Sequence, residues 1–334
     1  MAIGASAGGV EALQTIARGL PRDLDAAVAI VLHISPSGPG HLPSILARAG
    51  ALPAEHARHN QPIRRGRIYV APPDCHMLLH KSGFIRLSQG AKENGVRPAA
   101  DPLFRSAAVS CGSRAIGVVL TGALDDGTAG LAAIKGCGGI AVVQDPASAR
   151  MSSMPESALR HVLVDHCIPL HEMAPCIVQL VAKDPPKSER GYGAMRANLD
   201  EELRLLDGEG DVTRLGEPSL FTCPECQGML IRVRDPDVLR FRCHTGHAFS
   251  AASLQAAQRE AKDKSLWSAL RAVQENAMLI RKIADHEKGR NGVLGEELSR
   301  HADDAERLAH ELRRLRSDPP RRPSAAPPDR EKGS

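Results

Sequence analysis

The sequence has few aromatic residues and no long apolar run. Aromatic side chains make up 2% of its 334 residues, so the core must be aliphatic and a surface that stacks nucleic-acid bases on aromatic rings is not expected. The longest apolar run, 26–34, is interrupted by His33, whereas a membrane-spanning helix needs about 20 apolar residues. The N-terminal residues also lack the segments of a secretory signal peptide. These absences predict a cytoplasmic protein without membrane insertion.

Charge and cysteine usage also exclude several classes of protein. The 43 Lys and Arg residues against 39 Asp and Glu residues leave a net charge of +4, which is too balanced to predict a polyanionic partner. The 42% hydrophobic and 25% charged residues are typical of a globular protein and exclude a wholly disordered chain. Of the 8 cysteines, only Cys223, Cys226 and Cys243 lie close together. This spacing indicates one metal site in a reducing compartment, not a disulfide framework.

Short β-branched runs alternate with helical patterns over residues 1–183. We expect strands at 27–33, 67–71, 84–87, 116–121 and 140–144, and helices at 10–18, 41–49, 102–111, 129–136, 155–160 and 175–182. Continuously apolar strands that alternate with helices are typical of a parallel sheet with both faces covered. The sequence therefore predicts an α/β domain with a doubly wound, mostly parallel, Rossmann-like sheet.

The remaining chain divides into four parts by composition. We expect a linker at 184–218 with a short helical piece around 203–206, a zinc-ribbon-like module at 219–250, helices at 251–316 and a disordered tail at 317–334. Apolar stripes mark the two helices: Leu266, Leu270, Val273, Ala277 and Ile280, then Ala305, Leu308, Leu312 and Leu315. Either an antiparallel hairpin or a coiled-coil homodimer would bury these stripes.

A glycine-rich turn, GASAGG at 4–9, follows a short apolar strand and precedes a predicted helix. Ser6 in this turn would lie at the carboxyl edge of the sheet, where open α/β folds place their sites. Backbone amides at the start of the helix could hold an oxyanion. A turn of this type also cradles phosphates or serves structure alone, and that alternative stays open.

Two further polar features follow predicted strands. His33 ends the strand 27–33, and Asp125 and Asp126 follow the strand 116–121. Each has an ordinary structural interpretation, since a histidine can be a core polar residue and aspartates cap helices. Their shared place at strand ends nevertheless favours a Ser–His–Asp triad, which is recognised by geometry and not by sequence order.

Several segments together resemble, in the same order, the catalytic domain of CheB-type chemotaxis protein-glutamate methylesterases. They are GASAGGVEAL, the strand that ends at His33, GRIYVAPPDCHMLL, RPAADPLFRSA, GVVLTGALDDGTAGL and the stretch from Gly138 through SMPESA. The resemblance covers residues 1–181 approximately and is far more specific than any one of its motifs.

The resemblance implies a hydrolase that removes methyl esters from glutamate side chains of chemoreceptor signalling helices and also deamidates receptor glutamines. It implies that Ser6 is the nucleophile, His33 the general base and Asp126 the acid, because the family's acid precedes a glycine, here Gly127. Backbone amides, that of Ala7 among them, would stabilise the oxyanion. We expect methylated receptor or receptor-like helices as partners.

Three features depart from the pattern of the chemotaxis enzymes. Those enzymes carry an N-terminal receiver domain, and no such domain precedes Ser6, so we expect another form of control. The loop ISPSGPGHL after His33 and the TGALDD stretch differ from the usual family wording. We therefore expect differences in the substrate-facing surface and in the wall of the oxyanion site.

CPECQG at 223–228 and CHTGH at 243–247 have the spacing of two zinc knuckles. Cys223, Cys226, Cys243 and His247 would form a closed tetrahedral set, which is typical of structural zinc. His244 is the rival ligand, but it directly follows Cys243. A redox CxxC pair is the alternative, although it would need no second pair. We expect chelation to unfold 220–249 and to spare the esterase domain.

The module between the knuckles is rich in arginine. Arg232, Arg234, Arg240 and Arg242 would form either a basic strip or, as we favour, a solvated strand face. Three functions then compete: an active methylesterase, a catalytically weak scaffold that binds partners through the module and helices, and a nucleic-acid binder. The residues of the triad favour the first, and the charge balance disfavours the third.

Overall fold

The computed structural model describes residues 1–38, 40–185 and 193–317. Its main sheet has seven strands, and every pairing between neighbours is parallel. In spatial order the strands are β10 (His166–Ile168), β9 (Ile140–Gln144), β8 (Ile116–Val119), β1 (Ala2–Ala5), β2 (Ala27–Leu32), β5 (Arg67–Val70) and β3 (Ala54–His56). The short β1 therefore lies at the centre of the sheet.

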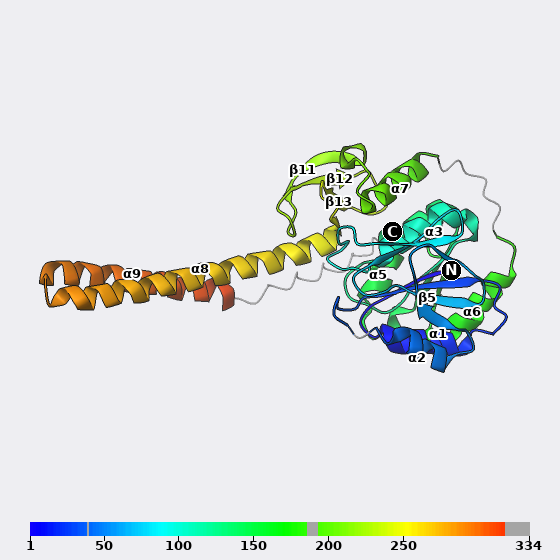
Figure 1. Ribbon diagram of the computed structural model, residues 1–334, viewed down its shortest axis with the longest axis horizontal. Coiled ribbons are helices and arrows are strands. Elements are labelled where there is room, and N and C mark those ends of the chain that lie inside the picture. Colours follow the sequence, from blue (N-terminus) through cyan, green and yellow to red (C-terminus); the bar gives the residue numbers. More distant parts are fainter. Residues whose placement is uncertain (39, 186–192, 318–334) are drawn as a thin grey trace, which may run out of the picture. The chain divides into compact units, whose positions relative to one another are not determined.

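Helices cover both faces of this sheet (Figure 1). One apolar core contains residues of α1 (Gly9–Gly19), α2 (Leu42–Ala49) and α6 (Leu170–Ala182). The other contains residues of α3 (Ala100–Cys111), α4 (Thr128–Gly136) and α5 (Ser153–His161). The predicted doubly wound α/β fold is thus confirmed, with aliphatic cores as the low aromatic content required.

Several elements of the α/β domain differ from the sequence expectation. The strand predicted at 84–87 is β7 (Phe84–Ser88), which lies in a separate antiparallel sheet between β4 (Gln61–Pro62) and β6 (His76–Leu79). The helix predicted from Pro175 begins at Leu170, because Met173 and Ala174 bury apolar surface ahead of the proline. The edge strands β3 and β10 have three residues each, too few for a periodic signal.

The stretch predicted as a linker contains helix α7 (Gly193–Leu206) and a 3₁₀ turn, Val212–Arg214. Leu199 and Glu202 of α7 are buried, Leu199 in one of the cores of the α/β domain. The residues 186–192 of the predicted linker lie outside the described residues. The second half of the stretch is therefore folded against the domain, which its polar composition did not indicate.

The cysteine-rich segment forms a four-stranded antiparallel sheet in the order β11 (Gly216–Thr222), β12 (Met229–Val233), β13 (Arg240–Cys243) and β14 (Ala248–Ser250). Its small core joins Leu230, Phe241 and Phe249 to two of the cysteines. We call these strands, with the start of the following helix to Ala257, the C-terminal module. The module and the α/β domain belong to one compact unit, 1–257.

A second compact unit begins at Gln258 and holds most of α8 (Ala251–Lys288) and all of α9 (Gly292–Ser317). The two helices form a hairpin in which Arg281 contacts Asp303 at 2.7 Å and Glu306 at 2.8 Å. The predicted stripe of α8 faces inward, with Leu270 and Ala277 buried.

The stripe predicted on α9 is wrong in two of its four positions. Leu308 and Leu315 are exposed, and the side chains that face α8 are Ala302, Ala305, Ala309 and Leu312. These four positions follow a 3–4 spacing in which small alanines let two helices approach closely. The predicted tail at 317–334 lies, apart from Ser317, outside the described residues.

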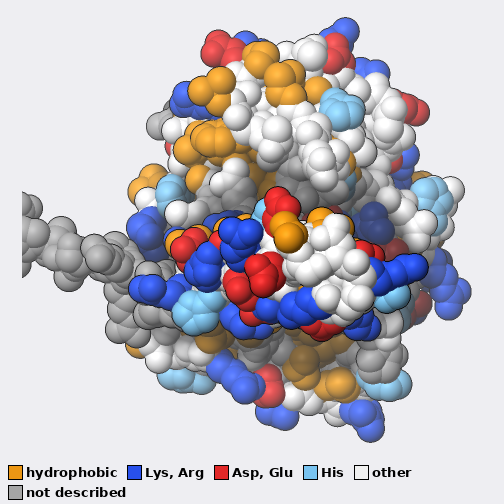
Figure 2. Space-filling model, turned by 90° about the vertical axis from the view of Figure 1, so that its left-hand side faces the viewer, with side chains coloured by type: hydrophobic (Ala, Val, Ile, Leu, Met, Phe, Trp, Pro, Cys, Tyr) orange, Lys and Arg blue, Asp and Glu red, His pale blue; other side chains and the backbone are white. Residues whose placement is uncertain are grey.

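Lys and Arg side chains are interspersed with Asp and Glu side chains over the face of the molecule in Figure 2. This distribution agrees with the small net charge of the sequence. Within the described residues, no helix is both long enough and apolar enough to cross a membrane.

Candidate active site

The carboxyl ends of β1 and β2 bring Ser6 and His33 to neighbouring positions. Ala5 of β1 stands opposite Leu32 of β2, so the next residue of each strand continues the same register. The His33 amide donates to the Ala5 carbonyl at 3.1 Å, and the Ser6 amide donates to the Thr121 carbonyl at 3.0 Å. Backbone hydrogen bonds to both neighbouring strands therefore fix the position of the serine.

The turn after Ser6 presents unpaired amides. Gly8 has a φ of 80°, a left-handed conformation that favours glycine, and it precedes the first turn of α1. The Thr121 hydroxyl donates to the Ala7 carbonyl at 2.9 Å and holds the turn from behind. Among the described residues, no backbone carbonyl accepts from the Ala7 or Gly8 amide. These two N–H groups at a helix N-terminus form a ready anion site.

His33 and Asp126 form a short polar contact at the carboxyl edge of the sheet. The distance between His33 Nε2 and Asp126 Oδ2 is 2.7 Å. Because an ionised carboxylate only accepts, Nε2 carries a ring hydrogen there, and in the neutral form of the ring Nδ1 then holds the lone pair. Nδ1 is thus the nitrogen that can serve Ser6 as a base. In the described part of the chain Ser6 Oγ has no hydrogen bond to His33, and such contacts often tighten only when substrate binds.

Asp126 is 2% exposed and is surrounded by donors. Its Oδ2 also accepts from the Ala100 amide at 2.5 Å, and its Oδ1 accepts from the Asp101 amide at 3.3 Å and from Asn94 Nδ2 at 3.0 Å. Burial alone would raise its pKa, but the hydrogen bonds, led by that from His33, lower the pKa to about 2. The N-terminus of α3 thus keeps this carboxylate ionised.

Asp101 lies beside Asp126 but has the opposite protonation. Burial, followed by the charge of Asp126, raises the pKa of Asp101 to about 8. Its Oδ1 accepts from the Gly130 amide at 2.7 Å, and its Oδ2 accepts from Asn94 at 3.0 Å. Asp101 lies in the motif RPAADPLFRSA, but the sequence predicted no role for either Asp101 or Asn94. The one local signal was the Asn94–Gly95 pair, which marks a turn.

The raised pKa of Asp101 predicts a specific pH dependence of stability. Between pH 4 and pH 8, approximately, the folded chain binds this proton and the unfolded chain does not, so the free energy of unfolding falls as pH rises, by at most about 1.4 kcal/mol per unit. Asp101→Asn should therefore flatten this fall in urea unfolding across that window. The exposed Asp23→Asn serves as the control, and an unchanged slope in Asp101→Asn would contradict the assignment.

Asp125, the rival acid of the same loop, does not reach His33. Its Oδ1 accepts a hydrogen bond from the Ser250 hydroxyl at 2.7 Å, and burial raises its pKa. Asp125 thus contacts the C-terminal module, while the next residue contacts the histidine.

The four predicted metal ligands converge in the C-terminal module. One ligand atom from each of Cys223, Cys226, Cys243 and His247 lies within 4.8 Å of the others. The Sγ atoms of Cys226 and Cys243 are 3.6 Å apart, and Cys243 Sγ lies 3.5 Å from His247 Nδ1. Ligands in a tetrahedron around Zn²⁺, with Zn–S of about 2.3 Å, stand about 3.8 Å apart. The residues therefore fit a tetrahedral ion, and the rival His244 is exposed outside the cluster.

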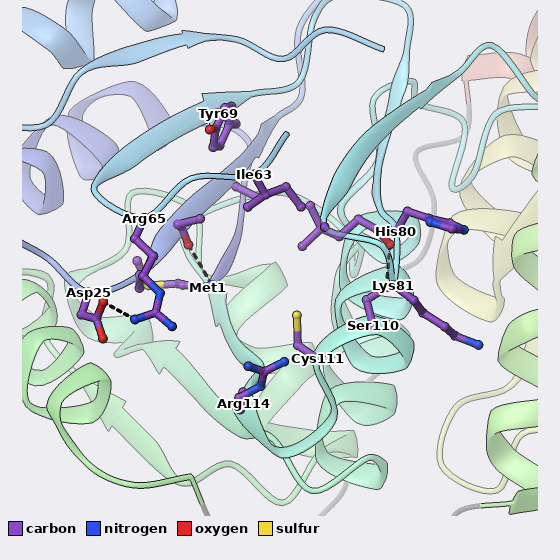
Figure 3. A pocket seen from close by; sticks show the side chains of 15 residues that line it. Met1, Asp25, Ile63, Arg65, Tyr69, His80, Lys81, Ser110, Cys111 and Arg114 are labelled. Carbon is purple, nitrogen blue, oxygen red and sulfur yellow. Dashed lines mark hydrogen bonds and ion pairs between the residues drawn. The ribbon is translucent and has the colours of Figure 1, made fainter. Parts of the chain in front are cut away.

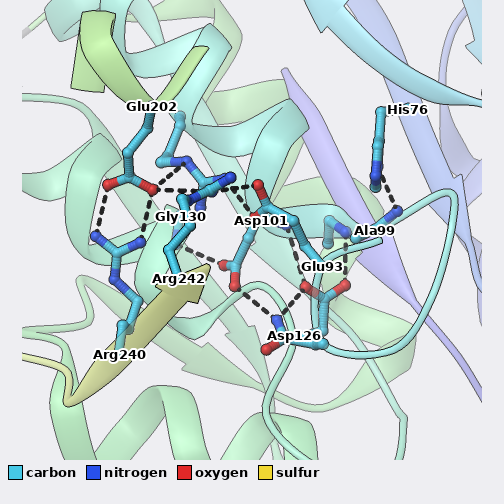
Figure 4. A network of polar contacts seen from close by, with 12 residues as sticks. His76, Glu93, Ala99, Asp101, Asp126, Gly130, Glu202, Arg240 and Arg242 are labelled. Atoms are coloured by element: carbon cyan, nitrogen blue, oxygen red, sulfur yellow. Dashed lines mark hydrogen bonds and ion pairs between the residues drawn. The ribbon is translucent and has the colours of Figure 1, made fainter. Parts of the chain in front are cut away.

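The four arginines of the module were expected to form a solvated strand face, and this expectation is wrong for two of them. Arg240 and Arg242 are buried and bind Glu202 of α7, Arg240 through two contacts of 2.8 Å (Figure 4). Arg242 also contacts Glu93 at 2.5 Å, and Arg105 of α3 pairs with the same glutamate. With Asp235, 2.8 Å from Arg240, three arginines meet three carboxylates.

This buried cluster joins the α/β domain, α7 and the module. Its burial is the reason that the prediction of a solvated strand face is wrong. The pKa of Glu93 is lowered, as burial is outweighed by the neighbouring arginines. Only Arg232 and Arg234 remain exposed, so no strip of four arginines exists.

The five cysteines outside the metal-ligand cluster differ in exposure. Cys137 is buried, whereas Cys75, Cys111 and Cys176 are half-buried and Cys167 is exposed. His76 is buried, with Nε2 3.1 Å from the Ala91 carbonyl.

A pocket of about 330 Å³ lies at the opposite, amino-terminal edge of the sheet (Figure 3). Met1 and Ala27, at the starts of β1 and β2, line it together with the ion pair of Asp25 and Arg65. None of the triad residues borders this pocket, so it is separate from the candidate active site.

The parallel sheet, the serine turn and the His–Asp pair at its carboxyl edge define an α/β protein of the serine-hydrolase class. The profile of the CheB methylesterase family matches residues 1–177, more than half of the 334 residues, and the chain belongs to this family.

Solved and curated relatives agree with this assignment. The crystal structure of the Thermotoga maritima CheB methylesterase catalytic domain superposes with a TM-score of 0.52 at 31% identity, covering 54% of this chain and 96% of that one. A protein-glutamate methylesterase/protein-glutamine glutaminase of Anaeromyxobacter dehalogenans is 39% identical over 53% of this chain and 52% of its own length. A Leptospira interrogans protein named for the same two activities is 39% identical over 53% of this chain and 92% of its own length. The similarity thus covers the α/β domain and leaves the C-terminal module outside it.

Proposed function

We propose that this chain is a protein-glutamate methylesterase that acts through Ser6, His33 and Asp126. The observation that carries the proposal is the 2.7 Å contact of His33 with an ionised, buried Asp126 at the strand end that neighbours Ser6. Membership of the CheB methylesterase family supplies the reaction, hydrolysis of a γ-glutamyl methyl ester. The scaffold alternative would not require this arrangement of charges.

The geometry supports the following sequence of steps. His33 Nδ1 takes the proton of Ser6 Oγ, which attacks the ester carbonyl, and the amides of Ala7 and Gly8 receive the oxyanion. The tetrahedral intermediate expels methoxide, which leaves as methanol with the proton from Nδ1. Water then gives a proton to Nδ1 and attacks the acyl-serine. The second tetrahedral intermediate breaks its bond to Ser6 Oγ, which takes the proton back from Nδ1, so that glutamate and free Ser6 are restored. Asp126 stabilises the imidazolium through Nε2 in both halves of the reaction.

A fluorophosphonate probe tests the nucleophile without knowledge of the substrate. Labelling of the full chain followed by peptide mapping should place the probe on Ser6, and His33→Ala should slow the labelling because Ser6 loses its base. Arg18→Ala, on the distant last turn of α1, serves as a control. A chain that folds but does not react would instead be the catalytically weak scaffold.

The substrate and location follow from the same proposal. We infer methylated receptor or receptor-like signalling helices as partners, and glutamine deamidation as a second reaction of the same acyl-serine chemistry, as the names of the relatives indicate for those proteins. No disulfide joins any of the eight cysteines, which supports a reducing, cytoplasmic compartment. Burial of two of the four module arginines disfavours a nucleic-acid partner.

We further propose that Cys223, Cys226, Cys243 and His247 hold a structural Zn²⁺, on the basis of their mutual distances. A closed set of four protein ligands would leave no open position for catalysis, so the ion would contribute folding energy to the module. Purified chain should contain about one zinc per molecule, and Cys223→Ser should lose it. Exposed Cys167→Ser is the matched control. A parent chain that binds no Zn²⁺ after addition of the ion would refute this part.

A further inference from the structure

Among the described residues, the side chain of Asn94 links the C-terminal module to the triad acid. Asn94 Nδ2 donates to Asp126 Oδ1 and to Asp101 Oδ2, both at 3.0 Å. Its Oδ1 accepts from the Ser250 amide at 2.9 Å and from the Ser253 hydroxyl at 2.8 Å. Both amide hydrogens thus donate to residues of the α/β domain, and the amide oxygen accepts two hydrogen bonds from the module.

This pattern leaves the Asn94 amide one orientation. Asp126 is an ionised acceptor, so a reversed amide would place its oxygen against a carboxylate. On the other side the Ser250 amide is a backbone donor, which would face an NH₂ group after reversal. The donors of the module and the carboxylate of Asp126 therefore favour the same orientation of the amide, in which an N–H group points at Asp126.

The backbone of Asn94 is held by the same strand of the module. Its φ is 53°, a strained value for a residue other than glycine, and its amide donates to the Ala248 carbonyl of β14 at 2.7 Å. The Ala248 amide in turn donates to the Lys92 carbonyl at 3.2 Å. Residues 92–94 thus pair with β14 as a short additional ladder.

Two further contacts connect the module to the α/β domain. The side chain of Glu93 pairs with Arg242, which directly precedes the proposed ligand Cys243 (Figure 4). The Ser250 hydroxyl donates to Asp125, the residue before the triad acid. Ser250 also caps α8, since its Oγ accepts from the Ser253 amide at 3.0 Å. The first turn of α8 and the Asn94 side chain are therefore fixed together.

We propose that Asn94 is a positioning residue for Asp126 and that the folded C-terminal module holds it in place, so that the module is a working part of the esterase site. The proposal rests on the proposed function in its assignment of Ser6 and His33. It revises the sequence-based expectation that unfolding 220–249 would spare the esterase domain, because five hydrogen bonds and a buried ion pair cross between the two parts.

The test compares Asn94→Ala and Ser253→Ala with Ser265→Ala, a serine on the same helix whose hydroxyl donates only to the Ala261 carbonyl. The rate constant of fluorophosphonate labelling, counted per reactive Ser6, should fall about 10- to 100-fold for Asn94→Ala. A smaller fall of about 3- to 10-fold is expected for Ser253→Ala, since one of the two module donors remains. Ser265→Ala should match the parent chain.

A spectroscopic readout separates positioning from loss of fold. The low-field proton resonance of His33 Nε2–H reports its hydrogen bond to Asp126, and Asn94→Ala and Ser253→Ala should shift or broaden it. Variants that are merely less stable would keep the parent resonance in their folded fraction. Parent-like resonance and labelling per site in both variants would overturn the proposal.

Chelation tests the coupling between the module and the active site independently, on the chain without substitutions. Removal of metal should lower the Ser6 labelling rate and alter the His33 resonance together, and added Zn²⁺ should restore both. If the module unfolds while both readouts stay unchanged, the coupling is refuted. Labelling and the resonance need no receptor substrate, so a parent chain that labels at Ser6 but releases no methanol would defeat the proposed reaction and leave the coupling testable.

Discussion

Asp126→Asn should lower kcat about 10⁴-fold while the chain stays folded. An asparagine at this position cannot stabilise the imidazolium, and it can hold the wrong tautomer of His33 by offering an NH₂ group to Nε2. Three donors, the amides of Ala100 and Asp101 and the side chain of Asn94, converge on the present carboxylate. The asparagine would leave only one side-chain oxygen to accept hydrogen bonds from these three donors and from the histidine.

Asp125→Asn is the matched control for this prediction. An asparagine there still offers an oxygen to the Ser250 hydroxyl, so we expect a change in kcat of less than about 3-fold. Steady-state kinetics and circular dichroism of both variants would check the pair. A large loss in Asp125→Asn with near-normal activity in Asp126→Asn would reverse the assignment of the acid.

Arg242→Met should lower the free energy of unfolding by about 3–5 kcal/mol. Arg242 is fully buried and contacts Glu93, Glu202 and the Gly246 carbonyl at distances between 2.5 and 3.3 Å. Its removal leaves two arginines against three carboxylates in a largely buried cluster. The remaining charge is costly because burial penalises an unpaired ion far more than an intact pair.

Two comparisons make this second prediction specific. Arg232→Met, on an exposed position of β12, should change stability by less than about 0.5 kcal/mol. The double variant Glu93→Gln with Arg242→Met should lose less stability than the two single losses added together, because it removes one charge of each sign. Urea unfolding measures the free energy of unfolding of the four variants and of the parent chain. Simple additivity would show that the charges of the cluster do not interact.

The sequence carried most of the information about the α/β domain. The apolar run that ends at His33 and the glycine turn at Ser6 are local signals, and the parallel sheet brings them together by its topology. The choice between Asp125 and Asp126 was not local, since both could cap α4. It depended on the resemblance to a family, and the structure places Asp126 beside His33.

Contacts distant in sequence escaped prediction. Glu93 and Arg242 are 149 residues apart, and neither residue shows in its own neighbourhood that the other will neutralise it. An arginine on alternate positions of a short strand has the pattern of a solvated face, and the packing of the module against α7 and the α/β domain buries it. Asn94 was missed for the same reason, because its partners come from three separate segments.

The shift in the α9 stripe has a different cause. Leucines dominate the sequence pattern, whereas the helix contact selects the alanines at 302, 305 and 309, which permit close approach. Hydrophobicity alone thus predicted a helix with an inner face and misplaced that face by part of a turn.

Release of methanol tests the central claim most directly. Purified chain is incubated with a receptor signalling domain that carries tritium-labelled glutamyl methyl esters, and volatile radioactivity is counted beside Ser6→Ala. The account predicts release by the parent chain and a loss of at least about 10³-fold in Ser6→Ala. Equal release by both chains would show that Ser6 is not the nucleophile and would contradict the account.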